Sequence, residues 1–189
     1  MFKRPNDKQY VDDRCGLILP WYTKPALDHL ISLDTKDYNV YEWGGGCSTV
    51  WYAHNCKSVT TLESDDKWAK EIGDYLIAND YDNYKINTIS VPASANKPHP
   101  NMDLYLDHIA LTNTKYDLII VDGSYRNDAL LISINHIKNG GYIIFDNYLQ
   151  DTSGYKDLPN AHIVNQFFAP LVYEQPGFGD WKTAIWQIH

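Results

Sequence analysis

Short apolar runs alternate with amphipathic segments along most of the chain. Runs of strand length occupy five stretches, at 40–43, 59–62, 86–91, 118–121 and 142–145. The run at 118–121 is apolar throughout, as expected of a parallel strand that is covered on both faces. The clearest helix spans 65–79, where two acids open the segment and apolar residues recur at helical spacing. This alternation predicts an α/β fold with a parallel sheet between two layers of helices.

Shorter helices fill the segments between the remaining strands. We expect helices at about 24–34 and at 48–55, and a third that carries the apolar positions of 130–137. The third is predicted to end at the Lys-Asn-Gly-Gly sequence of 138–141, because glycine is typical of the residue that follows a helix.

The C-terminal segment departs from this rhythm and predicts a β-hairpin. Apolar segments at 171–175 and 181–188 flank the Pro-Gly-Phe-Gly-Asp sequence of 176–180. A linker of this length joins antiparallel neighbours, so the sheet is expected to finish with a hairpin. The polar stretches 92–101 and 147–160 are rich in turn-forming residues, and each follows a predicted strand.

Length and composition indicate one globular domain. The 189 residues are 44% hydrophobic and 21% charged, which fits a single domain over 1–189, with an N-terminal arm at 1–22 and a core at 23–189. No apolar run approaches the roughly 18 residues of a membrane span, and the N-terminus lacks a signal-peptide core. The three cysteines lack C-x-x-C spacing, which argues against a disulfide framework or a structural zinc site. We therefore expect a cytoplasmic protein without a membrane partner.

The net charge bears on the class of partner. Sixteen basic and 24 acidic residues give a formal net charge of -8. A surface that binds phosphate backbones is basic, so this charge argues against nucleic acid as the partner. A small molecule is the expected substrate.

A glycine cluster and an acid mark a candidate ligand site. Gly44, Gly45 and Gly46 follow the first strand and precede a helix. Ligands of open parallel sheets bind beyond the carboxyl ends of the strands, where glycines let the backbone turn and approach them. The second strand ends at Glu63, where an acid can accept hydrogen bonds from both ribose hydroxyls. Together these features predict an adenosine-containing ligand.

The identity of that ligand depends on the spacing around the glycines. The dinucleotide fingerprint G-x-G-x-x-G/A needs glycine or alanine where this chain has Thr49, which disfavours NAD. Glu42, two residues before the first glycine, completes the pattern E-x-G-x-G, which resembles the first motif of class I S-adenosylmethionine-dependent methyltransferases. The resemblance extends to Asp122 after the fourth strand and to the terminal hairpin.

The resemblance implies a fold and a set of cofactor contacts. The fold is a Rossmann-like three-layer sandwich whose seven-stranded sheet has the order 3-2-1-4-5-7-6, with strand seven antiparallel. Glu42 would help to hold the methionine end of the cofactor, and Glu63 would bind the ribose. The other residues implied to contact the cofactor lie in the glycine turn or just after strands two and four: Gly44, Gly45, Gly46, Ser48, Thr49, Ser64 and Asp122.

One position departs from the family pattern. Members of the family often carry an acid followed by a small residue after the third strand, where the acid recognises the adenine amino group. This chain has Val-Pro-Ala-Ser at 91–94, so either the Ser94 side chain or the Ala93 amide takes that role. A subgroup with Pro-Trp before the first helix, here Pro20 and Trp21, resembles the chain more closely but implies no particular substrate.

Polar residues after strands four and five suggest a metal site. Asp122 follows strand four, and Asp146 and Asn147 follow strand five, so the three side chains are expected at the same edge of the sheet. Two carboxylates and an amide oxygen suit Mg²⁺. The arrangement resembles metal-dependent, catechol-type O-methyltransferases, in which the metal activates an acceptor hydroxyl. Tyr125 stands where those enzymes have a lysine.

The same residues have alternative interpretations. Without a metal, Asp122 orients the cofactor and Asp146-Asn147 caps a turn, while Asp122 and Asp146 remain the candidates for the catalytic groups. His99 and His108 are further candidates for a general base, because an unperturbed imidazole titrates near neutral pH.

These observations predict a methyltransferase that uses S-adenosylmethionine, with Mg²⁺ as a possible second cofactor. We expect O-methylation of a small hydroxylated acceptor such as a sugar or phenol. DNA amino-methyltransferases carry two prolines at the end of strand four, where this chain has Asp-Gly-Ser-Tyr at 122–125. The alternatives are an aminopropyltransferase-like or NAD-dependent enzyme, or a binding module without catalytic activity.

Overall fold

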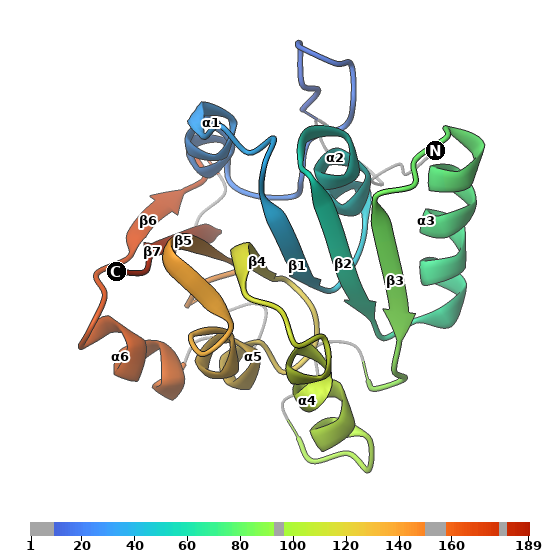
Figure 1. Ribbon diagram of the computed structural model, residues 1–189. Coiled ribbons are helices and arrows are strands. Elements are labelled where there is room, and N and C mark those ends of the chain that lie inside the picture. Colours follow the sequence, from blue (N-terminus) through green and yellow to red (C-terminus); the bar gives the residue numbers. More distant parts are fainter. Residues whose placement is uncertain (1–9, 93–96, 150–157, 178–180) are drawn as a thin grey trace.

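The sheet of the protein has the predicted topology. The structure, a computed structural model, describes residues 10–92, 97–149, 158–177 and 181–189. Seven strands form one sheet in the order β3-β2-β1-β4-β5-β7-β6 (Figure 1). β7 runs antiparallel to both β5 and β6, whereas β1 to β5 pair in parallel. The predicted α/β fold, its strand order and its C-terminal hairpin are therefore confirmed.

The elements follow one another in a regular alternation until the last two strands. The strands are β1 Asn39–Trp43, β2 Ser58–Glu63, β3 Tyr84–Thr88, β4 Tyr116–Val121, β5 Ile137–Asp146, β6 Leu171–Glu174 and β7 Lys182–Gln187. The helices in the described residues are α1 Lys24–Ser32, α2 Cys47–Asn55, α3 Asp66–Ala78, α4 Met102–Leu111, α5 Arg126–Ser133 and α6 Pro159–Asn165.

Helices cover both faces of the sheet, because alternate strand residues point to opposite sides. On β1, Val40 packs into a core beneath α1, α2 and α3, which also contains Leu27, Trp51 and Ile72. Its neighbour Tyr41 packs into a second core beneath α4, α5 and α6. Figure 1 shows these two groups of helices on opposite sides of the strands.

The N-terminal arm packs onto the first of these cores. Val11 and Ile18 form an isolated antiparallel bridge. Asp12 lies between them in sequence and accepts a hydrogen bond of 2.9 Å from the indole nitrogen of Trp51, on α2. Leu19 is also buried in this core. The described part of the arm is therefore fastened to α2.

The prediction for the helix before β5 was wrong at its C-terminal end. α5 ends at Ser133, and Ile137 already belongs to β5. The glycine pair lies inside the strand, where Gly140 has a φ of +83° and its amide donates to the carbonyl of Ile188. Here the pairing of β4 with β5 shifts in register. The glycines therefore permit a bulge instead of ending a helix.

Two smaller differences concern β3 and the helices beside the loops. The third strand spans Tyr84–Thr88 instead of 86–91, because its partner β2 ends at Glu63, opposite Thr88. The sequence pattern did not reveal α4 or α6, and α6 begins inside the stretch predicted as a loop at 147–160. Across the described ranges, the helices are too short or too polar to traverse a lipid bilayer.

Candidate functional site

The glycine turn after β1 is held against the turn after β4. Gly44 has a φ of +85°, a conformation that favours glycine. A Cβ atom on Gly44 would lie 2.7 Å from the Cα of Gly123 and 2.9 Å from the carbonyl oxygen of Asp122. The indole nitrogen of Trp68, on α3, donates to the carbonyl of Gly45 at 2.8 Å. The turn is thus fixed from two sides.

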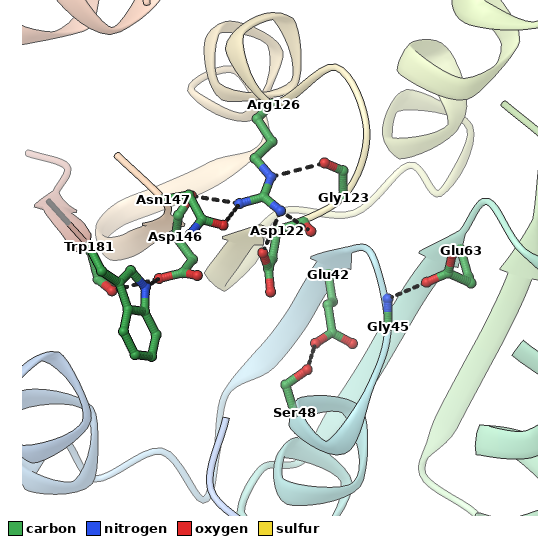
Figure 2. A network of polar contacts seen from close by, with 11 residues as sticks. Glu42, Gly45, Ser48, Glu63, Asp122, Gly123, Arg126, Asp146, Asn147 and Trp181 are labelled. Carbon is green, nitrogen blue, oxygen red and sulfur yellow. Dashed lines mark hydrogen bonds and ion pairs between the residues drawn. The ribbon is translucent and has the colours of Figure 1, made fainter. Parts of the chain in front are cut away.

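Glu42 lies beneath this turn and is completely buried. Its carboxylate accepts a hydrogen bond from the hydroxyl of Ser48 (Figure 2). It also accepts from the hydroxyls of Thr49 (2.5 Å) and Thr61 (2.9 Å). Thr49 also accepts from the amide of Gly46 at 3.0 Å, so the carboxylate braces the start of α2. Burial raises the pKa of Glu42 to about 7, against the effect of these three donors.

Glu63, at the end of β2, connects the glycine turn to the start of α3. Its Oε2 accepts from the amide of Gly45 at 2.8 Å. Its Oε1 accepts from the amides of Ser64 (2.6 Å) and Asp65 (2.9 Å) and from the Ser64 hydroxyl. A carboxylate has about four acceptor positions. Because Oε2 accepts only from Gly45 among the described residues, it can still accept from a ligand hydroxyl.

These contacts bring most of the predicted cofactor-binding residues to one edge of the sheet. The glycine turn, Glu42, Ser48, Thr49, Glu63 and Ser64 form one hydrogen-bonded group, and Asp122 lies across from it. The convergence follows from the parallel strands, whose carboxyl ends lie side by side. Ala93 and Ser94 lie outside the described residues.

Asp146 ends β5 and is buried beside the terminal hairpin. Its Oδ1 accepts from the indole nitrogen of Trp181 at 3.1 Å (Figure 2). The same oxygen accepts from the hydroxyl of Thr183 at 2.7 Å. Burial raises the pKa of Asp146, and the negative charge of Asp122 raises it further, while Arg126 opposes the rise. Thr183 and Trp181 come from the hairpin, which the sequence pattern did not connect to this carboxylate.

The side chain of Arg126 connects two of the three residues that were expected to bind Mg²⁺. Arg126, at the start of α5, forms an ion pair with Asp122 at 2.8 Å and donates to the amide oxygen of Asn147 at 2.7 Å (Figure 2). Asp146 is directed to Thr183 and Trp181. Because a guanidinium holds Asp122 and Asn147 and the hairpin holds Asp146, the three predicted ligands do not fit Mg²⁺ in this arrangement. Among the described residues, no group of three or more His, Cys, Asp or Glu side chains is arranged to hold a metal ion either.

The two candidate histidines lie apart from this group. The Nδ1 of His108 lies 2.8 Å from the hydroxyl of Tyr41, in the middle of β1, and burial lowers the pKa of this imidazole. His99 accepts from the amide of Asn101 just before α4. Neither contact involves the residues that follow β1, β2 or β5.

Sequence analysis did not predict the pairing of two buried tyrosines near the site. The hydroxyls of Tyr22, before α1, and Tyr52, on α2, lie 3.0 Å apart, and both side chains are completely buried or nearly so. Burial raises both pKa values well above 10, and the charges of Glu42 and Asp122 add to this effect. Both phenols therefore stay protonated. No local motif identifies this pair, because the segment before α1 and the helix α2 are 30 residues apart in sequence and meet only in the folded protein.

Comparisons with known proteins identify the fold. No protein-family model matches the chain, and no curated protein matches its sequence. An rRNA methylase from Streptococcus thermophilus is similar in structure, with a TM-score of 0.62 and 15% identity over 85% of this chain and 92% of that one. A methyltransferase-like protein from Silicibacter pomeroyi has a TM-score of 0.58 and 24% identity over 90% of each chain.

A third structure was determined with a ligand. This candidate methyltransferase from Streptococcus mutans, in complex with SAH, has a TM-score of 0.59 and 14% identity over 85% of this chain and 94% of that one. All three identities are below 25%, so the likeness concerns the fold. The chain therefore has the Rossmann-like, three-layer fold that these methyltransferase structures share.

Proposed function

We propose that the protein is an S-adenosylmethionine-dependent methyltransferase. The observation that carries this proposal is the bond between the Glu63 carboxylate and the amide of Gly45, which joins the acid at the end of β2 to the glycine turn after β1. An acid at that position suits a ribose, and the adjacent glycine backbone suits the remainder of an adenosine-containing ligand. The fold shared with a candidate methyltransferase in complex with SAH supports the same ligand.

The local geometry fits such a cofactor. A Cβ atom on Gly46 would meet nothing nearer than the Ser48 hydroxyl, at 3.8 Å, so the backbone at Gly46 is open to close approach. We assign ribose binding to Glu63 with Ser64, the remaining turn contacts to Gly44, Gly45, Gly46, Ser48 and Thr49, and the methionine end to the region of Glu42 and Asp122. S-adenosylmethionine carries an activated methyl group, so the protein chiefly orients the acceptor.

The proposed acceptor is a small hydroxylated molecule, and Asp146 is the proposed base. The Asp146 carboxylate is buried, and two donors on Oδ1 fix its orientation. Within the described ranges nothing donates to its Oδ2, which leaves that oxygen able to take the proton of an acceptor hydroxyl. Asp122, which is paired with Arg126, is the second candidate.

Cofactor binding gives the direct test. We expect calorimetry to detect S-adenosylhomocysteine binding at micromolar affinity, and Glu63→Ala to weaken it more than about tenfold, a loss of roughly 1.4 kcal/mol. The loss follows because the variant removes the acceptor for the ribose hydroxyls. Glu71→Ala, which removes an exposed carboxylate from α3, is the matched control and should bind as the wild-type protein does.

A thermal unfolding curve accompanies each titration, because Glu63 also accepts bonds from the backbone. A folded wild-type protein that binds neither S-adenosylmethionine nor S-adenosylhomocysteine would refute the proposal. Tighter binding of NAD, NADP or decarboxylated S-adenosylmethionine in the same screen would instead favour one of the alternative enzyme classes. Binding without turnover on any acceptor would favour a non-catalytic module.

A second experiment tests the proposed class of methyl acceptor. Radioactive methyl groups should pass to small hydroxylated molecules faster than to bulk RNA or DNA, because the net charge of -8 disfavours a phosphate backbone. Equimolar acceptors in one reaction, separated by size, give the comparison. Faster labelling of nucleic acid would reverse this assignment and leave the cofactor proposal intact.

A further inference from the structure

We propose that Arg126 is a positioning residue that supplies, from within the chain, the positive charge and the cross-link that a divalent cation would supply between the turns after β4 and β5. The proposal concerns the native protein with or without bound cofactor. It replaces the predicted Mg²⁺ site with a side chain.

Every donor of the Arg126 guanidinium is used inside the protein. Nε donates to the carbonyl of Gly123 at 3.0 Å. Nη1 donates to the carbonyl of Asp146 and to the side chain of Asn147, both at 2.7 Å. Nη2 donates to the carbonyl of Asp122 at 2.9 Å and forms the ion pair with its carboxylate at 2.8 Å. A guanidinium has five N–H donors, and these five contacts account for all of them.

This arrangement joins two turns that are distant in sequence. Gly123 and Asp122 belong to the turn after β4, whereas Asp146 is the last residue of β5 and Asn147 follows it. Asn147 has a φ of +59°, an uncommon conformation that the bond from Nη1 helps to hold. Because no N–H group of the guanidinium remains to bind a substrate, Arg126 acts through the groups that it positions.

The guanidinium and a divalent cation would compete for the same oxygens. A cation bound by Oδ1 of Asp122 and by the amide oxygen of Asn147 would have to displace Nη2 and Nη1, which would leave a positive side chain, only 10% exposed, beside a second positive charge. Such a displacement is unfavourable because like charges repel strongly in a buried site. We therefore expect the wild-type protein to exclude divalent and trivalent cations here, and its methyl transfer to survive excess chelator.

Terbium luminescence tests the proposal without cofactor or turnover. Tb³⁺ binds oxygen ligands as Ca²⁺ does and emits when a nearby indole is excited, and Trp181 lies against Asp146. We expect the wild-type protein to show no Asp122-dependent signal up to about 1 mM Tb³⁺, the range of weak calcium sites. Arg126→Ala should gain a saturable signal that is half-maximal at a Tb³⁺ concentration at least tenfold below about 1 mM. Adding Asp122→Asn to this variant should remove the signal.

Conservative variants separate charge from shape. Arg126→Lys keeps the positive charge and should restore exclusion of Tb³⁺, whereas the neutral Arg126→Gln should gain the signal as Arg126→Ala does. Loss of the ion pair and the hydrogen bonds of the buried Arg126 side chain should lower the thermal unfolding midpoint of the neutral variants by roughly 6–20 °C. Mg²⁺ should raise the midpoint of Arg126→Gln and leave that of the wild-type protein unchanged.

Two results would overturn the proposal. One is an Asp122-dependent Tb³⁺ signal in the wild-type protein, because it would show that cation and guanidinium occupy the site together. The other is a folded Arg126→Gln or Arg126→Ala protein that gains no such signal. If both neutral variants fail to fold, the wild-type titration, with Asp122→Asn as its control, still decides between exclusion and binding.

Discussion

Gly44→Ala is expected to lower the free energy of unfolding by about 4 kcal/mol or more, the range of severe steric conflicts in a core. The new Cβ atom would lie 2.7 Å from the Cα and 2.8 Å from the amide nitrogen of Gly123. Both are backbone atoms, so no flexible side chain can move aside. The φ of +85° adds a conformational cost of roughly 1–2 kcal/mol for any residue with a Cβ. Urea unfolding measures the total.

Substitutions at two other glycines separate the steric cost of Gly44→Ala from its conformational cost. Gly177→Ala has a similar φ of +79° but meets nothing within 4 Å, so it should cost only about 1–2 kcal/mol. Gly46→Ala has an extended backbone and a nearest neighbour at 3.8 Å, and should change stability by about 1 kcal/mol or less. Equal losses for Gly44→Ala and Gly177→Ala would mean that the turns after β1 and β4 are not in tight contact.

Glu42→Gln should remove a strong dependence of stability on pH. Burial raises the pKa of Glu42 from 4.5 to about 7 in the folded protein. Between these values the folded state binds more protons than the unfolded state, so this contribution to stability is complete below pH 4.5 and is lost as the pH rises through 7. The stability of the wild-type protein relative to Glu42→Gln should therefore fall by about 3 kcal/mol from pH 4 to pH 8.

The comparison of two proteins isolates the effect of Glu42. His108 and His136, whose pKa values burial lowers, contribute in the opposite direction, but both proteins contain them. Thr61→Val provides a second check: it removes one donor to the carboxylate, so it should move the fall to higher pH. A difference curve that stays flat from pH 4 to pH 8 would show that Glu42 is not held in a desolvated environment.

The same environment connects stability to the proposed ligand. Glu42 and Asp146 are buried acids whose pKa values are raised, and the negative charge of Asp122 contributes to both. A cationic ligand such as S-adenosylmethionine would favour their ionised forms and thereby offset part of this cost. Under the proposed function, cofactor binding should therefore release protons, and calorimetry in buffers of different ionisation enthalpy measures that release.

Local patterns in the sequence were sufficient to predict the alternation of strands and helices, the C-terminal hairpin and the acids and glycines at the strand ends, whereas the strand order came from the resemblance to class I methyltransferases. Short runs of apolar and β-branched residues identified β1, β2, β4 and the middle of β5, because such residues are typical of strands in a covered parallel sheet. Once the strands are parallel, their carboxyl ends lie at one edge, so the positions of Glu42, the glycine turn and Glu63 in the sequence already placed them together. The short strand β6 and its partner β7 followed from the length of their linker.

Contacts that depend on tertiary packing could not be predicted in this way. The pair Gly140-Gly141 has the local pattern of a helix end, but pairing with β4 and β7 makes it part of a strand. Sequence analysis assigned no role to Arg126, because three of its five acceptors are backbone carbonyls, which every residue carries and no motif marks. Its position 20 residues before Asp146 becomes meaningful only when β4 and β5 lie side by side. The sequence by itself determined which acids reach the sheet edge, and tertiary packing decided that a guanidinium joins Asp122 to the end of β5.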